Sequence, residues 1–186
     1  MPDIRTLLPS DVWIEEDDLY LRARGEGMQG QTFSRSAIQG ASILTTGVVQ
    51  ASGLVLHKGD RVFNIIAGVS VNGAAGTLTK VGLYDKAGNL LALSADIQAQ
   101  FNSGATPRAV IGVLSQAYVA PATDLYYAVI LSVGGTQPTL LWGVNLSASL
   151  FVVGSGQFPH WQTAAADLTA TLVPAQTGLA YWFDWS

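Results

Sequence analysis

The residues of this chain that could carry chemistry are few and lie far apart in the sequence. There is no cysteine, which excludes thiolate catalysis, disulfides and cysteine-ligated metal sites. The two histidines, His57 and His160, have few carboxylates near them, Asp60 being the nearest. Because a metal site needs clustered ligands, both histidines are interpreted as surface or interface residues, and no metal or cofactor is expected.

One glycine motif has the form of a nucleotide-binding fingerprint. Gly25, Gly27 and Gly30 match the spacing G-x-G-x-x-G. That motif functions between a strand and a helix, with an acidic residue about 20 positions further on. No helical pattern follows here, and position 50 is Gln. The segment is therefore interpreted as a hinge.

The sequence offers no recognisable catalytic group. Gly154-Ser155-Gly156 lacks the nucleophile-elbow pattern, and neither histidine has an orienting acid beside it. The acids beyond the N-terminal region stand mostly at turns or strand starts, where Asp bonds to the local backbone. They are Asp60, Asp85, Asp96, Asp124, Asp167 and Asp184. The protein is predicted not to be an enzyme.

Aromatic residues are the most suggestive group in the C-terminal half. Trp161 follows Pro159 and His160 in a predicted loop over residues 154–163. Exposed Trp can stack on sugar rings, but aromatic residues also fill cores and subunit interfaces. Both interpretations are kept, the second being preferred. The residues predicted for an interface or glycan contact are Trp142, His160, Trp161 and Trp182.

Composition limits the class of protein. Only 12% of the 186 residues are charged and the net charge is −4, so no nucleic-acid partner is expected. An average soluble domain has about 25% charged residues, and the deficit predicts that sister subunits cover much of the surface. The longest apolar runs, at 125–133 and 146–153, are too short to span a membrane. No secretory signal begins the sequence, so synthesis in a cytoplasm is expected.

The first 35 residues differ from the rest. Seven of the thirteen acids fall within residues 1–26. This stretch also holds apolar anchors too few to build a core, namely Trp13, Ile14, Leu19, Tyr20 and Leu21. The preferred interpretation is an extended arm that docks on a neighbour and orders on binding. The alternative is an edge strand plus a leader folded back on its own domain.

Residues 36–186 read as one all-β domain. Within residues 78–96, two alternating runs flank a turn that contains Gly88, which predicts an antiparallel hairpin. Eight to ten such strands follow one another with turn signals between them, residues 97–106 being a predicted surface loop with one helical turn. The closing run is expected to place Tyr181, Phe183 and Trp185 on one face. These features predict an antiparallel, jelly-roll-like β-sandwich with an N-terminal arm.

Several segments resemble a domain common in bacteriophage virion proteins. The resemblance rests on four motifs: a G-L-Y-D-x-x-G-x-L-L-A-x-S-x-D hairpin, an A-P-A segment before a tyrosine-rich strand, a G-G-T-x-P-T-L turn and an aromatic last strand. They stand here at residues 82–96, 118–129, 134–140 and 180–186. The resemblance covers about residues 33–186 and carries no catalytic residue. This chain differs from such tail fibres in size, because they attach the domain to long stalks and here only a short acidic segment precedes it.

The resemblance implies a virion surface protein made in the host cytoplasm. The expected role is a capsid decoration or head-fibre-type protein that self-associates as a homotrimer. Residues 1–35 would attach it to other virion proteins, in the capsid or the tail. The alternative is a minor tail protein or receptor-binding module that contacts host-surface carbohydrate.

Overall fold

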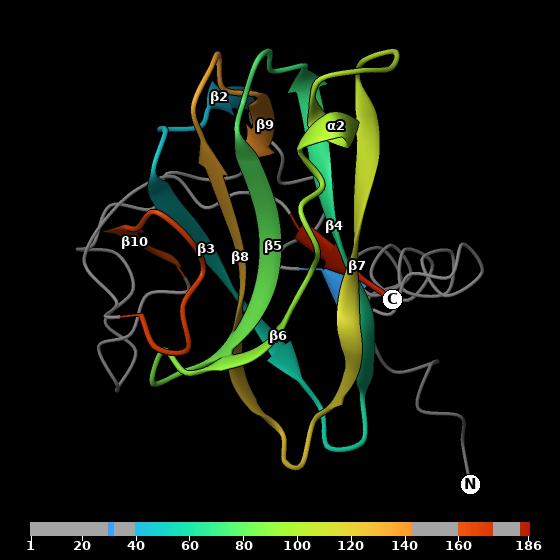
Figure 1. Cartoon of the computed structure of the whole chain (residues 1–186). Coiled ribbons are helices and arrows are strands. Elements are labelled where there is room, and N and C mark those ends of the chain that lie inside the picture. Colours follow the sequence, from blue (N-terminus) through green and yellow to red (C-terminus); the bar gives the residue numbers. More distant parts are fainter. Residues whose placement is uncertain (1–29, 32–39, 143–159, 173–182) are drawn as a thin grey trace, which may run out of the picture.

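The computed structural model describes residues 30–31, 40–142, 160–172 and 183–186. These residues form antiparallel strands and one helical turn (Figure 1). The elements are β1 (Gly30–Gln31), β2 (Gly40–Ile43), β3 (Val48–Leu56), β4 (Arg61–Val71), β5 (Leu78–Asp85), β6 (Leu90–Leu93), α2 (Gln98–Phe101), β7 (Arg108–Val119), β8 (Asp124–Val133), β9 (Thr139–Trp142), β10 (His160–Ala164) and β11 (Phe183–Trp185).

From β2 onward, successive strands alternate between two sheets, with the β5–β6 hairpin as the exception. One sheet, here called the β4 sheet, contains the order β2-β9-β4-β7, and the other, the β8 sheet, contains β3-β8-β5-β6. All pairings are antiparallel. Two interlocked four-stranded sheets with this alternation are the jelly-roll arrangement. The predicted all-β, jelly-roll-like sandwich is confirmed.

Three short strands extend this frame. β10 pairs with β3 at the edge of the β8 sheet. β11 pairs with β4 beyond the stretch that β9 occupies, and β1 pairs with β11. Residues 30–31 are the only described part of the predicted arm, and they form an edge strand. The predicted anchors Trp13, Ile14, Leu19, Tyr20 and Leu21, and the predicted domain boundary at residue 35, lie outside the described residues.

The main core lies between the two sheets. Leu56, Ile65, Leu83, Ile130 and Phe183 are fully buried there. Trp185 joins this core with 5% exposure, so Phe183 and Trp185 share a face as predicted. Tyr181 and Trp182 lie outside the described residues.

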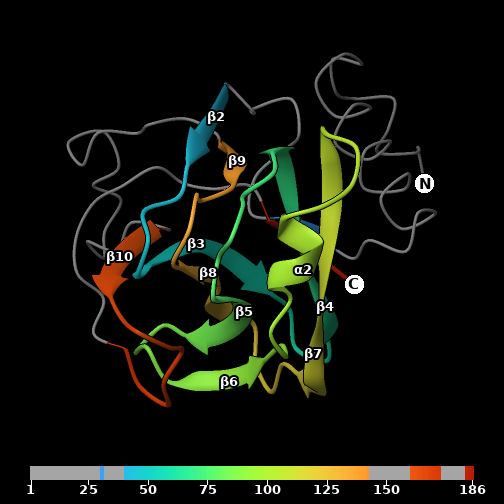
Figure 2. The ribbon, with the colours of Figure 1, turned by 45° about the horizontal axis from the view of Figure 1, so that its top comes forward.

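Glycine allows β7 to approach the opposite sheet closely. A Cβ atom at Gly112 would come within 2.1 Å of Val81 Cγ2 and 3.1 Å of Ile97 Cδ1. The inner side of β7 is therefore fixed tightly against β5. Figure 2 shows α2 beside these strands, and its Phe101 is buried in the same core.

The predicted hairpin is β5–β6, and Asp85 organises its turn. The Oδ1 atom of Asp85 accepts hydrogen bonds from the amides of Ala87 and Asn89, both at 2.8 Å. Gly88 adopts φ = 86°, in the left-handed region that glycine tolerates best. Burial alone would raise the pKa of Asp85, but hydrogen bonds from Asn89, Ala87 and Gly88 outweigh it and hold that pKa below its usual value.

Two of the long strands are continuous. β7 runs without a break over Arg108–Val119. β3 likewise runs from Val48 to Leu56. The predicted helical turn within residues 97–106 is confirmed as α2.

Candidate functional site

The residues predicted for an interface or glycan contact lie on different sheets. Trp142 is the last residue of β9 in the β4 sheet. His160 and Trp161 begin β10 in the β8 sheet, opposite Ser52 and Ala51 of β3. Trp182 lies outside the described residues. His160 and Trp161 were expected in a loop, and this was wrong, because the backbone of β10 pairs with β3 over five residues.

Within the described ranges, no group of three or more His, Asp or Glu side chains could hold a metal ion. His57 is exposed, and its backbone amide donates to Asp60 Oδ2 at 2.8 Å. In the same part of the chain, no helix is long and apolar enough to cross a membrane. The candidate functional features are therefore surfaces, of which three stand out.

The first surface is the outer face of the β8 sheet, which the chain itself covers. Residues 165–172, the cover segment, follow β10 and lie over β5 and the β5–β6 turn (Figure 1). Leu168 and Leu172 pack there on Val129 and Leu131 in a second buried cluster. Val49, Ala51, Tyr84 and Tyr127 complete that cluster. This sandwich therefore has a second core outside its main one.

Polar contacts fix the cover segment in place. The Tyr84 hydroxyl donates to the Thr169 carbonyl at 2.8 Å, and Leu90 N donates to Ala170 O at 2.8 Å. Lys80 Nζ contacts Asp167 Oδ2 at 2.8 Å. Burial raises the pKa of Tyr84, and the nearby charge of Asp167 adds to that rise. The hydrogen bond from Lys80 lowers the pKa of Asp167.

The second surface is the outer face of the β4 sheet, which is open and apolar. Seven large hydrophobic residues are exposed in the described part of the chain, and six of them belong to this sheet. Along β7 and the adjoining end of β4 they form what we call the apolar strip: Phe63, Ile111, Val113 and Val119. Ile43 and Val71 lie at the far end, where β2 and β4 flank Thr139.

Alternation along β7 separates its two sides. Val110 and Leu114 face the core with 4% and 6% exposure, whereas Ile111 and Val113 face outward with 46% and 63%. The strand has no charged residue after Arg108. The guanidinium of Arg108 is engaged with Asn72 Oδ1 at 2.8 Å and with the carbonyls of Gln100 and Ser103.

The open part of this outer face does not extend over the centre of the β4 sheet. Ile66 and Asp184 are cross-strand partners next to the strip, on the same side of the sheet as Ile111. They are only 5% and 2% exposed. The open apolar surface therefore follows β7 and the β2 end, and not the centre of the sheet.

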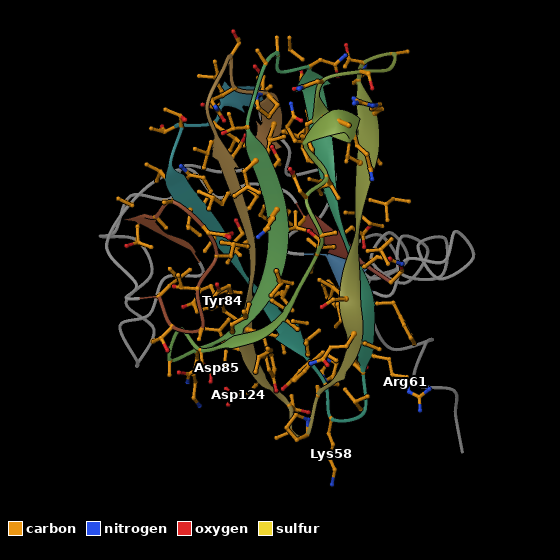
Figure 3. All side chains as sticks on the ribbon, viewed as in Figure 1. Lys58, Arg61, Tyr84, Asp85 and Asp124 are labelled. Carbon is orange, nitrogen blue, oxygen red and sulfur yellow. The ribbon has the colours of Figure 1, made fainter. Side chains whose placement is uncertain are left out.

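The third surface is the end of the sandwich where the charged residues gather, here called the turn end. It consists of the β3–β4, β5–β6 and β7–β8 turns. Of the eleven Lys, Arg, Asp and Glu residues in the described ranges, six lie at this end: Lys58, Asp60, Arg61, Asp85, Lys86 and Asp124. Figure 3 shows Lys58, Arg61, Asp85 and Asp124 around the lower end of the molecule.

Hydrogen bonds tie these three turns together. Gly59 N donates to Ala120 O at 2.8 Å, and Ala120 N donates to Asp60 O at 2.9 Å. Lys86 Nζ bonds to Asp124 Oδ2 at 2.8 Å and lowers the pKa of that carboxyl group. The turn end is thus a charged surface of fixed shape.

No protein-family model matches the chain, and no curated protein matches it.

Residue-level prediction from sequence missed both the apolar strip and the turn end. A signal for the strip was present in residues 109–114, where the run AVIGVL has no polar residue on either side of the strand. Such a strand is normally covered on both faces. The turn end could not be recognised because its residues come from three turns far apart in the sequence.

Proposed function

We propose that this protein is a non-enzymatic structural component of a bacteriophage particle. It stands on the virion surface as a capsid decoration or head-fibre-type protein, attached through its N-terminal arm and self-associating through the β-sandwich as a homotrimer. The sequence resemblance supplies the virion setting, and the jelly-roll frame is compatible with it. Fold alone does not imply function.

One observation carries the self-association: six of the seven exposed large hydrophobic residues belong to a single sheet. Scattered single apolar residues are ordinary on a protein surface. Apolar residues gathered on one face mark an interaction site. The absence of charge on β7 after Arg108 distinguishes this face from one that evolved to face water.

Immunogold electron microscopy tests the virion role. Particles of the phage that encodes the chain are labelled with antibody raised against residues 40–142. Label over the head supports a decoration or head-fibre role. Absence of label from all purified particles, with the protein detectable in the lysate, rules the proposal out.

The turn end favours a second candidate, a minor tail or receptor-binding protein that contacts host-surface carbohydrate. The exposed side chains of Lys58 and Arg61, close to Asp60, can hydrogen-bond to sugar hydroxyls. The same micrographs separate the two candidates, because a receptor-binding protein gives label confined to the tail end. Adhesion of the purified protein to host envelopes, lost in Lys58→Ala/Arg61→Ala, would then be the second observation required.

A further inference from the structure

We infer that the apolar strip of Phe63, Ile111, Val113 and Val119 is the surface through which one copy of this chain binds another. This inference deepens the self-association in the proposed function by naming the surface that makes it. It needs no knowledge of the particle, so it can be tested on the purified protein.

Exposure and position define the strip as a continuous feature. Ile111, Val113 and Val119 are 46%, 63% and 49% exposed, and Phe63 is 43% exposed. Val113 pairs with Asn64, and Val119 pairs with Arg61, on either side of the irregularity that contains Phe63. The remaining exposed residues of β7 are uncharged: Ala109, Ser115, Gln116 and Ala117.

The strand that carries the strip has only some of the usual protections against self-contact. β7 is the last strand of its sheet, linked to the other sheet by the isolated Ser94–Leu114 bridge. Natural edge strands are commonly blunted by Lys, by Pro, by short length or by a β-bulge. β7 has 12 residues and neither Lys nor Pro, and its pairing with β4 is irregular only between Val62 and Asn64. Where copies of the chain are concentrated in an assembly, we expect such a strand to contact a second copy before any other partner.

Charge also favours a copy of the same chain. The strip presents no acid or base that could select an oppositely charged partner, and the flanking Arg61 lies at one end only. Apolar Ile and Val side chains are self-complementary, as symmetric contacts require. The chain as a whole has only 12% charged residues, which agrees with a covered surface.

The size of the face sets an upper bound on the contact. A strand of 12 residues is about 40 Å long at about 3.3 Å per residue, and four strands are about 19 Å wide. The face of β2-β9-β4-β7 therefore measures at most about 760 Å², and its centre at Ile66 and Asp184 is buried. Each partner in a standard interface buries about 800 Å². The strip together with Ile43 and Val71 therefore forms part of such an interface.

The test compares two valines of similar exposure on opposite sheets. Val113→Glu introduces a charge into the strip, whereas Val55→Glu places the same charge on the outer face of the β8 sheet, where Val55 is 53% exposed. Mass is measured for the full chain and both variants by light scattering and sedimentation over a hundredfold range of concentration. Circular dichroism melts check that both variants fold.

We expect the wild type and Val55→Glu to form the same oligomer, a multiple of 19.5 kDa. The oligomer of Val113→Glu is expected to dissociate at concentrations at least tenfold higher than those at which the wild-type oligomer dissociates. If Val113→Glu fails to fold, Val113→Thr, which keeps the β-branch, replaces it with a smaller shift in the same direction.

Three outcomes would overturn the inference. The wild type could be a monomer throughout, Val113→Glu could assemble like the wild type, or both glutamate variants could weaken assembly equally. A chain lacking residues 1–29 is measured in parallel. If that deletion abolishes assembly while Val113→Glu does not, the N-terminal segment makes the contact and the strip does not. None of these results bears on the labelling of particles, so the proposed function is judged separately.

Discussion

The two outer faces of this sandwich carry similar apolar residues but differ in burial. On the β8 sheet, Val129 and Leu131 face outward and are buried, because Leu168 and Leu172 of the same chain lie over them. On the β4 sheet, Ile111 and Val113 face outward and remain open. An apolar outer face is thus covered on one sheet and open on the other, and only the long-range course of the chain distinguishes the two.

Removing the internal cover should produce the largest effect. Leu168→Ala deletes a buried side chain of the second core and is expected to lower the free energy of unfolding by about 2–4 kcal/mol, from lost transfer energy and the cavity left behind. Ile111→Ala on the open face should cost less than about 1 kcal/mol. Urea denaturation in dilute samples measures both. Equal losses would contradict the distinction between a covered and an open face.

A smaller effect is expected from the hydrogen bond that holds the cover. Tyr84→Phe removes the donor to the Thr169 carbonyl, which should cost about 1 kcal/mol. Hydrogen exchange of residues 167–172 should accelerate in this variant. Tyr126→Phe is the matched control, since its hydroxyl bonds to Ala122 O at the turn end. Unchanged exchange in Tyr84→Phe would show that apolar packing alone retains the segment.

The smallest effect should come from the ion pair of the cover segment. Lys80 lowers the pKa of Asp167 from its ordinary value of 3.8. Because the folded state then binds its proton at lower pH than the unfolded state, the stabilisation is complete above the unfolded pKa and is lost as pH falls through the folded value. Asp167→Asn should cost less than about 0.5 kcal/mol at pH 7, since the pair is partly exposed.

Thermal melts at pH 7 and pH 3 check the direction of this pH dependence of stability. The difference between Asp167→Asn and wild type should shrink at pH 3, where the carboxyl group is protonated in the unfolded chain and increasingly so in the folded one. Asp124→Asn at the turn end is the control for a general charge effect. A difference that grows on acidification would mean that the ion pair with Lys80 does not stabilise the cover.

Local patterns predicted the frame of this molecule well. The β5–β6 hairpin was identifiable because alternation on both strands meets a turn in which Asp85 and Gly88 have clear backbone roles. The buried pair Phe183 and Trp185 was likewise visible as alternate aromatics. These features depend on neighbours within a few residues, so the sequence displays them directly.

Long-range pairing was not predictable in the same way. The sequence predicts a loop at His160 and Trp161, which follow a proline, whereas their backbone pairs with β3 more than a hundred residues earlier. The run of β7 over residues 109–114 is apolar on both sides of the strand, as is the run of β8 over residues 128–131. Nothing local distinguishes the strand that the cover segment protects from the strand left open.

The pairing of β11 with β4 has a consequence for synthesis. Phe183 pairs with Ala67, and Ser186 O accepts the amides of Phe63 and Asn64. A ribosome adds about 5–20 residues per second, so roughly 6–25 s pass between the synthesis of β4 and that of β11, its last partner strand. For the later part of that interval, from the completion of β7 at Val119, the apolar side of β7 is already present. The self-association that we infer for the apolar strip would then be able to begin between nascent chains, before β11 has been made.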